Sequence, residues 1–218
     1  MKIAVIACGH DAKDAPFNSD WQIWSMGRNY HWIPNFDCWF EMHSLEIVKA
    51  NSQPEMVDFL NKAGKKLYSG FPKDFKDSTP YPIEILDKYR RYMTSSVAYM
   101  LALAIEENPE EIGVWGVDMT GDNEYMHQRS ACEYLLGLAE GRGIKVTTSP
   151  SCPLLKSKRM YAIEYNELSH ELTQTLADLD NAIGQAQKKV LEGEYYKGQQ
   201  AGLNTMRETL TRLKRRWG

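Results

Sequence analysis

Several common signatures of function are missing from this sequence. Its four cysteines form no C-x-x-C pair, which argues against a zinc ribbon and a thioredoxin-like redox site. The fingerprints G-x-G-x-x-G and G-x-x-x-x-G-K-[ST] are absent, so a standard dinucleotide fold and a P-loop enzyme are disfavoured. No G-x-S-x-G elbow occurs either, which disfavours a serine hydrolase. Whatever chemistry the chain performs must come from residues outside these motifs.

Positive charge and long apolar runs are also scarce. The formal net charge is −3 and the pI is near 6.0, so no global basic field favours nucleic acid as a partner. No segment reaches the ~18 uninterrupted apolar residues needed to cross a bilayer. The apolar run Met1–Ala7 is too short for a signal peptide and is typical of a first strand. We therefore expect a cytoplasmic protein without a membrane partner.

Short apolar strands alternate with helical segments over residues 1–155. The predicted helices are 54–63, 83–92, 96–107 and 128–142, and the predicted strands are 2–7, 23–26, 37–42, 65–69, 112–117 and 144–148. This alternation predicts an α/β fold, a Rossmann-like three-layer sandwich with a mostly parallel sheet. Residues 95–107 are apolar nearly all round, so we expect that helix to be packed between the sheet and another element.

Residues 156–218 follow a different pattern, which predicts a helical extension. Apolar residues recur every three or four positions, at Leu168, Leu172, Leu176, Leu179, Ile183, Ala186 and Val190. Glycines interrupt this stripe before it resumes at Leu203. We expect a long helix or a helical hairpin whose stripe is covered by the α/β body or by a second subunit. The second case predicts a homo-oligomer formed through the C-terminal helices.

Small and polar residues follow the first two predicted strands. Gly9 and His10 come directly after the first strand, where a loop can hold a phosphate or ribose against backbone N–H groups. After the second strand, Arg28 could bind a phosphate and Asn29 a base or ribose. The alternatives are a plain turn at Gly9 and a solvated surface loop at Arg28.

Two further clusters are predicted at the same edge. An acid and an imidazole, Glu41 and His43, follow the third strand. The hydroxyl residues Thr94 and Ser95 stand at the start of the apolar helix. Hydroxyl residues there are first of all helix caps, but together with free N–H groups they can also form an anion site.

The richest segment begins where the strand 112–117 ends. Gly116 is followed by Asp118, whose carboxylate could bind a metal or a ribose hydroxyl. Asp122 and Glu124 would add oxygen ligands for Mg²⁺. His127 is the general-base candidate because the ordinary pKa of histidine lies near neutrality.

Arg129 completes this segment and offers a fork for a phosphate or carboxylate. The alternative for Arg129 is an ion pair with Glu133, four residues on. Together, Asp118, His127 and Arg129 form the predicted catalytic set.

Four segments carry a resemblance to a known superfamily: 6–13 (IACGHDAK), 24–29 (WSMGRN), 93–105 (MTSSVAYMLALAI) and 111–119 (EIGVWGVDM). Residues 1–150 resemble the Rossmann-like superfamily of bacterial CMP-sialic-acid-dependent sialyltransferases and archaeal hydroxymethylpterin diphosphokinases. They are also similar to uncharacterised phage and prophage members, which share the segments 37–43 and 125–129.

The resemblance implies a nucleotide or nucleotide-sugar ligand. It places Gly9, Asn29, Thr94, Ser95, Gly116 and Asp118 around that ligand, and His127 is the nearest counterpart of the family's catalytic histidine. It implies a glycosyl or diphosphoryl transferase of phage type, with Mg²⁺ in the second case, acting in the host cytoplasm if a phage encodes it. The alternatives are a non-catalytic nucleotide-binding accessory protein and a structural protein that oligomerises through its helical tail.

Overall fold

The computed structural model describes residues 1–51, 54–119, 123–156, 160, 167–190 and 195–217. The chain divides into two compact units, Met1–Lys156 and Ser157–Gly218.

In the first unit, the described residues form one seven-stranded sheet with the order β5-β4-β3-β2-β1-β6-β7. Every neighbouring pair is parallel. The strands are β1 (Lys2–Ile6), β2 (Trp21–Met26), β3 (Cys38–Glu41), β4 (Lys66–Ser69), β5 (Thr79–Pro80), β6 (Glu111–Trp115) and β7 (Lys145–Thr148). The prediction of an α/β, Rossmann-like sandwich is confirmed, and the sheet is wholly parallel.

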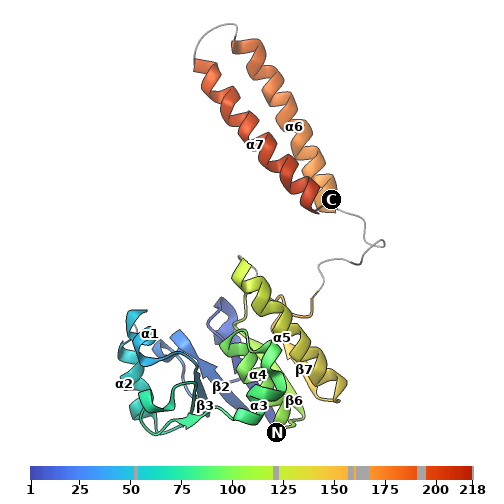
Figure 1. Cartoon of the computed structure of the whole chain (residues 1–218). Helices are drawn as coiled ribbons and strands as arrows, with labels where there is room; N and C mark the ends of the chain where they lie inside the picture. Colours follow the sequence, from blue (N-terminus) through green and yellow to red (C-terminus); the bar gives the residue numbers. More distant parts are fainter. Residues whose placement is uncertain (52–53, 120–122, 157–159, 161–166, 191–194, 218) are drawn as a thin grey trace. The chain divides into compact units, whose positions relative to one another are not determined.

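Helices cover both faces of this sheet, which gives three layers (Figure 1). The helices α1 (Leu45–Ala50) and α2 (Pro54–Ala63) pack on one face, and α3 (Ile83–Tyr89), α4 (Ser96–Glu106) and α5 (Asn123–Gly141) pack on the other. Side chains of β1 alternate between the two layers, because successive residues of a strand point to opposite faces. Thus Ile3 and Val5 belong to one core cluster, while Ala4 and Ile6 belong to the other.

The helix α4 is the most deeply buried of these elements. Every residue from Val97 to Ile105 except Tyr99 is buried, and α4 contacts α3, α5, β1 and β3. This confirms that the apolar helix lies between the sheet and other elements. Ser95 caps it, since the Ser95 side chain accepts a hydrogen bond from the backbone N–H of Ala98.

The helix α5 begins earlier than the sequence pattern suggested. Its predicted start was Gln128, whereas the helix begins at Asn123. Residues 123–129 therefore follow helical periodicity instead of forming a loop. This shift decides which of their side chains can share a face.

The order of the strands creates a topological switch point between β1 and β6. The chain runs from β1 outward to β5 and then returns to place β6 on the other side of β1. Loops leaving β1 and β6 at the carboxyl edge therefore run in opposite directions. In open α/β sheets a ligand crevice forms at such a point.

The second unit is a helical hairpin, one of the two predicted forms. The helix α6 (Glu167–Val190) packs against α7 (Tyr195–Trp217). Its stripe of Leu172, Leu176, Leu179 and Ile183 is partly or wholly buried. None of the described helices has the length and apolar character needed to cross a membrane.

Candidate functional site

A cavity of about 810 Å³ lies at the carboxyl edge of the sheet, around the switch point. Its volume falls within the ~300–1,000 Å³ that is usual for small-molecule sites. The walls come from the exits of β1, β2, β3 and β6 and from the starts of α4 and α5. The lining residues are Ala7, Cys8, Gly9, Met26, Gly27, Arg28, His43, Thr94, Ser95, Ser96, Val97, Gly116, Val117, Asp118, Met119, Tyr125 and Gln128.

Two glycines allow the β1 and β6 exits to approach each other closely. The backbone N–H of Gly9 donates to the carbonyl of Gly116 over 2.7 Å. A Cβ on Gly9 would lie 2.5 Å from a carboxylate oxygen of Asp118, and one on Gly116 would collide with the carbonyl oxygen of Ala7. Gly116 also has φ +71°, which disfavours any other residue. The cavity floor is thus bare backbone, suited to a ligand that contacts peptide groups directly.

The buried side chain of Asp11 fixes the backbone turn at Gly116. Its carboxylate is buried and accepts hydrogen bonds from the backbone N–H of Gly116 and from the hydroxyls of Ser149 and Ser151. Burial raises the pKa of Asp11, but these hydrogen bonds outweigh it and hold the pKa below its ordinary value. Asp11 therefore joins the exits of β1, β6 and β7.

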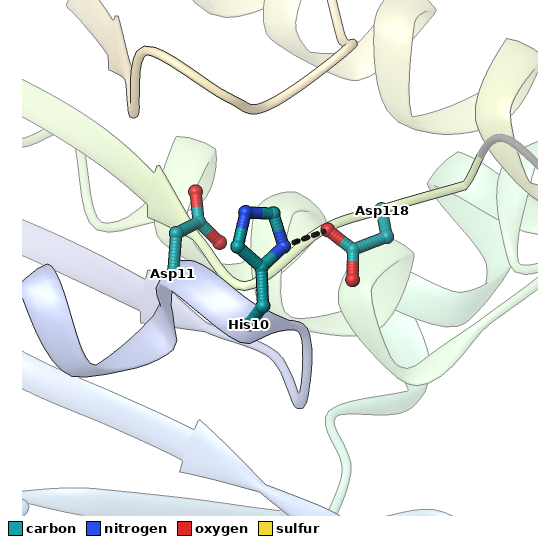
Figure 2. A group of neighbouring side chains, drawn as sticks. All are labelled: His10, Asp11 and Asp118. Carbon is teal, nitrogen blue, oxygen red and sulfur yellow. Dashed lines mark hydrogen bonds and ion pairs between the residues drawn. The ribbon is translucent and has the colours of Figure 1, made fainter.

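His10, Asp11 and Asp118 lie close enough to suggest a metal site, since one ligand atom of each falls within 4.8 Å of the others (Figure 2). The donor set does not fit Mg²⁺, which prefers oxygen ligands. The oxygens of Asp11 already accept three hydrogen bonds, and His10 Nδ1 lies 3.2 Å from Asp118 Oδ1. Asp118 is thus the only exposed carboxylate of these three residues, and His10 already pairs with it. The predicted ligands Asp122 and the side chain of Glu124 lie outside the described residues.

The start of α4 presents hydrogen-bond donors to the cavity. Thr94, Ser95, Ser96 and Val97 all line it. The first N–H groups of any α-helix lack partners within the helix, and here Ser95 serves that of Ala98. The N–H groups of Ser96 and Val97 and the hydroxyls of Thr94 and Ser96 remain to meet a ligand anion. The capping role and the anion-site role predicted for this segment are therefore compatible.

Asn29 and Arg28 occupy different surroundings, although they are adjacent in η2 (Gly27–His31). Asn29 is 1% exposed, and its amide nitrogen lies 2.9 Å from the Ala7 carbonyl and 2.9 Å from Ser25 Oγ. It therefore fixes the end of β1 and does not line the cavity. Arg28 does line the cavity and is exposed, so its charge is available to an anionic ligand.

His127 and Arg129 also lie outside the cavity lining. Tyr125 and Gln128 line the cavity from one face of α5. His127 is two residues after Tyr125 and therefore points about 200° around the helix axis from Tyr125. His127 is exposed. Arg129 bonds Glu133 Oε1 at 2.9 Å and the Pro153 carbonyl at 2.8 Å, so the ion-pair alternative is the one observed. The catalytic roles of both residues stay predictions without support from their placement.

His43 is held by a buried acid at the β3 exit. Its Nδ1 lies 2.7 Å from Glu41 Oε1, and its backbone N–H donates to the same oxygen over 2.9 Å. The Glu41 side chain is 4% exposed, whereas that of His43 is 52% exposed. The hydrogen bond to Glu41 raises the pKa of His43, and burial opposes this only in part. We call these two residues the Glu41–His43 pair.

The cavity brings together Gly9, Thr94, Ser95, Gly116 and Asp118 from the predicted site, with His10 bonded to Asp118. Cys8, Tyr125 and Gln128 were not predicted as site residues. Their signal in the sequence is position alone, directly after a strand or one helical turn apart. Burial raises the pKa of Cys38 and Cys132 to about 12, which fits a structural role for those two thiols.

The fold and the cavity define an α/β protein with a site of small-molecule size at its topological switch point. No protein-family model matches the chain, and no curated protein matches it. Among solved structures, it is similar to the sialyltransferase CstII from Campylobacter jejuni in complex with the substrate analogue CMP-3FNeuAc. The identity there is 16% and the TM-score 0.48, over 70% of this chain and 80% of that chain. A structure of a CST-II variant in complex with CMP shows 14% identity and a TM-score of 0.46, over 78% and 98% of the two chains.

Proposed function

We propose that this protein is a transferase that binds a nucleotide or nucleotide sugar at the carboxyl edge of its sheet. One observation carries the proposal. A single cavity of nucleotide size is bounded by a helix N-terminus, an arginine, an exposed carboxylate and a glycine-lined backbone floor. The helix N-terminus and the arginine suit a phosphate, and the carboxylate and the backbone floor suit a ribose and the group attached to it.

The phosphate would lie between the start of α4 and Arg28. Helix N-termini carry partial positive charge and bind phosphates through unpaired N–H groups. Ser96 and Val97 supply such groups, and the Arg28 guanidinium offers charge-assisted hydrogen bonds. The same groups would stabilise the negative charge that develops on a leaving nucleotide phosphate.

The ribose would lie toward Asp118 and the glycine floor. The Asp118 carboxylate is about half exposed, and a carboxylate at the carboxyl edge of an open α/β sheet can accept hydrogen bonds from ribose hydroxyls. His10 Nδ1 lies 3.2 Å from Asp118 Oδ1, and when Nδ1 carries the ring proton it donates to that carboxylate and so restrains its direction. The floor at Gly9 and Gly116 lets the sugar or base approach the backbone.

Of the two predicted reactions, glycosyl transfer fits the described residues better than diphosphoryl transfer. Diphosphoryl transfer relies on a divalent ion held by free oxygen ligands. Asp11 is committed to its hydrogen bonds, which leaves Asp118, itself paired with His10, as the exposed carboxylate among the described residues of the cluster. Glycosyl transfer from a nucleotide sugar needs the phosphate contacts described above and a proton acceptor for the incoming hydroxyl.

Calorimetric titration with CMP, CDP, UMP, UDP, ADP and ATP tests this function. We expect at least one nucleotide to bind, and Arg28→Ala to weaken it about 10- to 100-fold, the effect of losing a charge-assisted hydrogen bond of ~1.5–3 kcal/mol. Lys62→Ala is the matched control, because Lys62 is an exposed cation on α2 outside the cavity lining. Failure of every nucleotide to bind would refute the proposal.

The non-catalytic accessory protein is the alternative, and it predicts binding without turnover of any nucleotide sugar. The phage origin implied by the resemblance stays a prediction. Self-association through the hairpin is also a proposal, which two exposed apolar side chains of α7 support: Met206 is 57% exposed and Leu213 is 39% exposed. A second copy of the hairpin would cover them.

A further inference from the structure

The proton acceptor for group transfer can be sought among the histidines, because imidazole titrates near neutral pH. His31 stacks on Tyr30 with ring centroids 3.9 Å apart and does not line the cavity. His127 is exposed on a face of α5 away from the lining, and the side chain of His170 lies outside the described residues. His10 and His43 remain, each paired with a carboxylate.

These two pairs differ in burial and in access to the cavity. His10 bonds Asp118 at 3.2 Å, and both side chains are largely exposed, at 71% and 49%. His43 bonds Glu41 at 2.7 Å, and that carboxylate is 4% exposed. His43 lines the cavity and His10 does not. A buried carboxylate orients an imidazole more firmly and interacts with it more strongly than one in water does.

Resting on the proposed function, we propose that His43 is the general base of the transfer reaction and that Glu41 is its positioning residue. The assignment places the proton acceptor at the β3 exit, whereas the sequence resemblance placed it on the segment after β6. It follows from the position of His43 in the cavity wall and from its hydrogen bond to the buried Glu41.

The geometry defines the tautomer and the free nitrogen of the ring. Glu41 Oε1 accepts from the backbone N–H of His43 and lies 2.7 Å from Nδ1, so the neutral ring carries its proton on Nδ1 and donates it to the carboxylate. Nε2 is then the basic nitrogen. The same division of labour, a carboxylate that orients and a far nitrogen that accepts, operates in the Ser-His-Asp triad.

The reaction balances with this single base. Nε2 of His43 takes the proton of an acceptor hydroxyl while the oxygen of that hydroxyl forms a bond to the anomeric carbon of the donor sugar. The bond from that carbon to the phosphate oxygen breaks, and its electron pair stays on the nucleotide phosphate, where Arg28 and the start of α4 lie. Glu41 balances the imidazolium, and the half-exposed ring then passes its proton to solvent.

The dependence of turnover on pH distinguishes a general base from a residue that only stabilises the fold, because a structural residue would not set the pH profile of the reaction. Because the Glu41 hydrogen bond raises the pKa of His43, turnover should rise with pH through an apparent value above the ordinary ~6.5 of histidine. Glu41→Gln removes the charge and should lower that value. The other titratable or charged groups of the lining are Cys8, Arg28, Asp118 and Tyr125. Cys8 is also near Glu41, but burial raises the pKa of its thiol above 9.0.

The experiment measures nucleotide affinity and hydrolysis of the bound nucleotide sugar, with water as the acceptor, in the full chain. We expect His43→Gln to bind the nucleotide within about threefold of wild type and to lose about 100-fold or more in kcat, the usual contribution of a general base. His31→Gln is the matched control and should match wild type in both assays. Glu41→Gln should lose less than His43→Gln and shift the pH profile downward.

The outcomes separate this inference from the proposed function. No nucleotide binding by wild type defeats the proposed function itself. Binding with turnover that His43→Gln leaves intact overturns the assignment, and a loss confined to His127→Gln or His10→Gln would move the base to that residue. Binding without turnover of any bound nucleotide sugar also overturns it, in favour of a non-catalytic protein.

Discussion

Replacing Asp11 should reveal how strongly the cavity floor is held together. In Asp11→Ala, the buried N–H of Gly116 and the hydroxyl of Ser149, a residue that is 2% exposed, lose their acceptor. Each unpaired buried group costs about 1–3 kcal/mol, so the free energy of unfolding should fall by about 2–6 kcal/mol. Ser151 is exposed and can turn to water. Asp11→Asn keeps one acceptor oxygen and should lose less.

Urea unfolding followed by tryptophan fluorescence measures this loss. All tryptophans except Trp217 lie in the Met1–Lys156 unit, so the signal reports mainly on that unit. Ser151→Ala is the control and should cost less than about 1 kcal/mol, since its partner keeps two other donors. A loss below about 1 kcal/mol for Asp11→Ala would refute the role given to this carboxylate.

The lowered pKa of Asp11 also predicts how the stability of the protein depends on acidic pH. Because the pKa of Asp11 is lowered in the folded protein, its stabilisation is complete above the unfolded value of ~3.9 and disappears as the pH falls through the folded value. The stability difference between wild type and Asp11→Asn should therefore shrink between about pH 5 and pH 2. A difference that stays constant over this range would contradict the assignment of the charge.

Three further predictions concern the β6 exit, the α4 end and the hairpin. Gly116→Ala should lower the free energy of unfolding in urea by about 2 kcal/mol or more, and the control Gly64→Ala by about 1 kcal/mol. Both glycines have positive φ, but of the two only Gly116 has a backbone atom where the new Cβ would lie. Equal losses would refute the close approach of the chain at Gly116. Burial raises the pKa of Glu106, but hydrogen bonds from Lys88, Tyr89 and Arg142 outweigh burial and lower that pKa to about 2. Glu106→Gln should therefore destabilise the protein above pH ~4.3 and have little effect near pH 2. The opposite pH trend would disprove that assignment. If the hairpin self-associates as proposed, Met206→Glu should lower the mass measured by light scattering, and an unchanged mass would exclude this face.

The sheet could be predicted from the sequence because buried parallel strands are apolar on both faces. Runs such as those at 2–7 and 112–117 have this form, and both became strands of the core. The strand β5 escaped prediction, since it has two residues, Thr79 and Pro80, and both are exposed. Such an edge strand has no apolar signal of its own.

The edge that holds the cavity could also be predicted, because parallel strands place their exits together. Which side chains face the ligand could not. Asn29 looked like a ligand contact but turns inward to the β1 backbone, and the sequence has no mark of that choice. The helical phase of residues 123–129, which turns His127 away from the face that carries Tyr125, could not be predicted because the polar composition of the segment hid it.

Hydrogen–deuterium exchange of the full chain with and without its bound nucleotide tests the central claim most directly. If the nucleotide occupies the cavity at the switch point, exchange should slow in the segments 7–9, 26–28 and 94–97, which line it. The hairpin should exchange as before. Protection confined to the hairpin, or none in the three segments at saturating nucleotide, would contradict the claim that this cavity is the site.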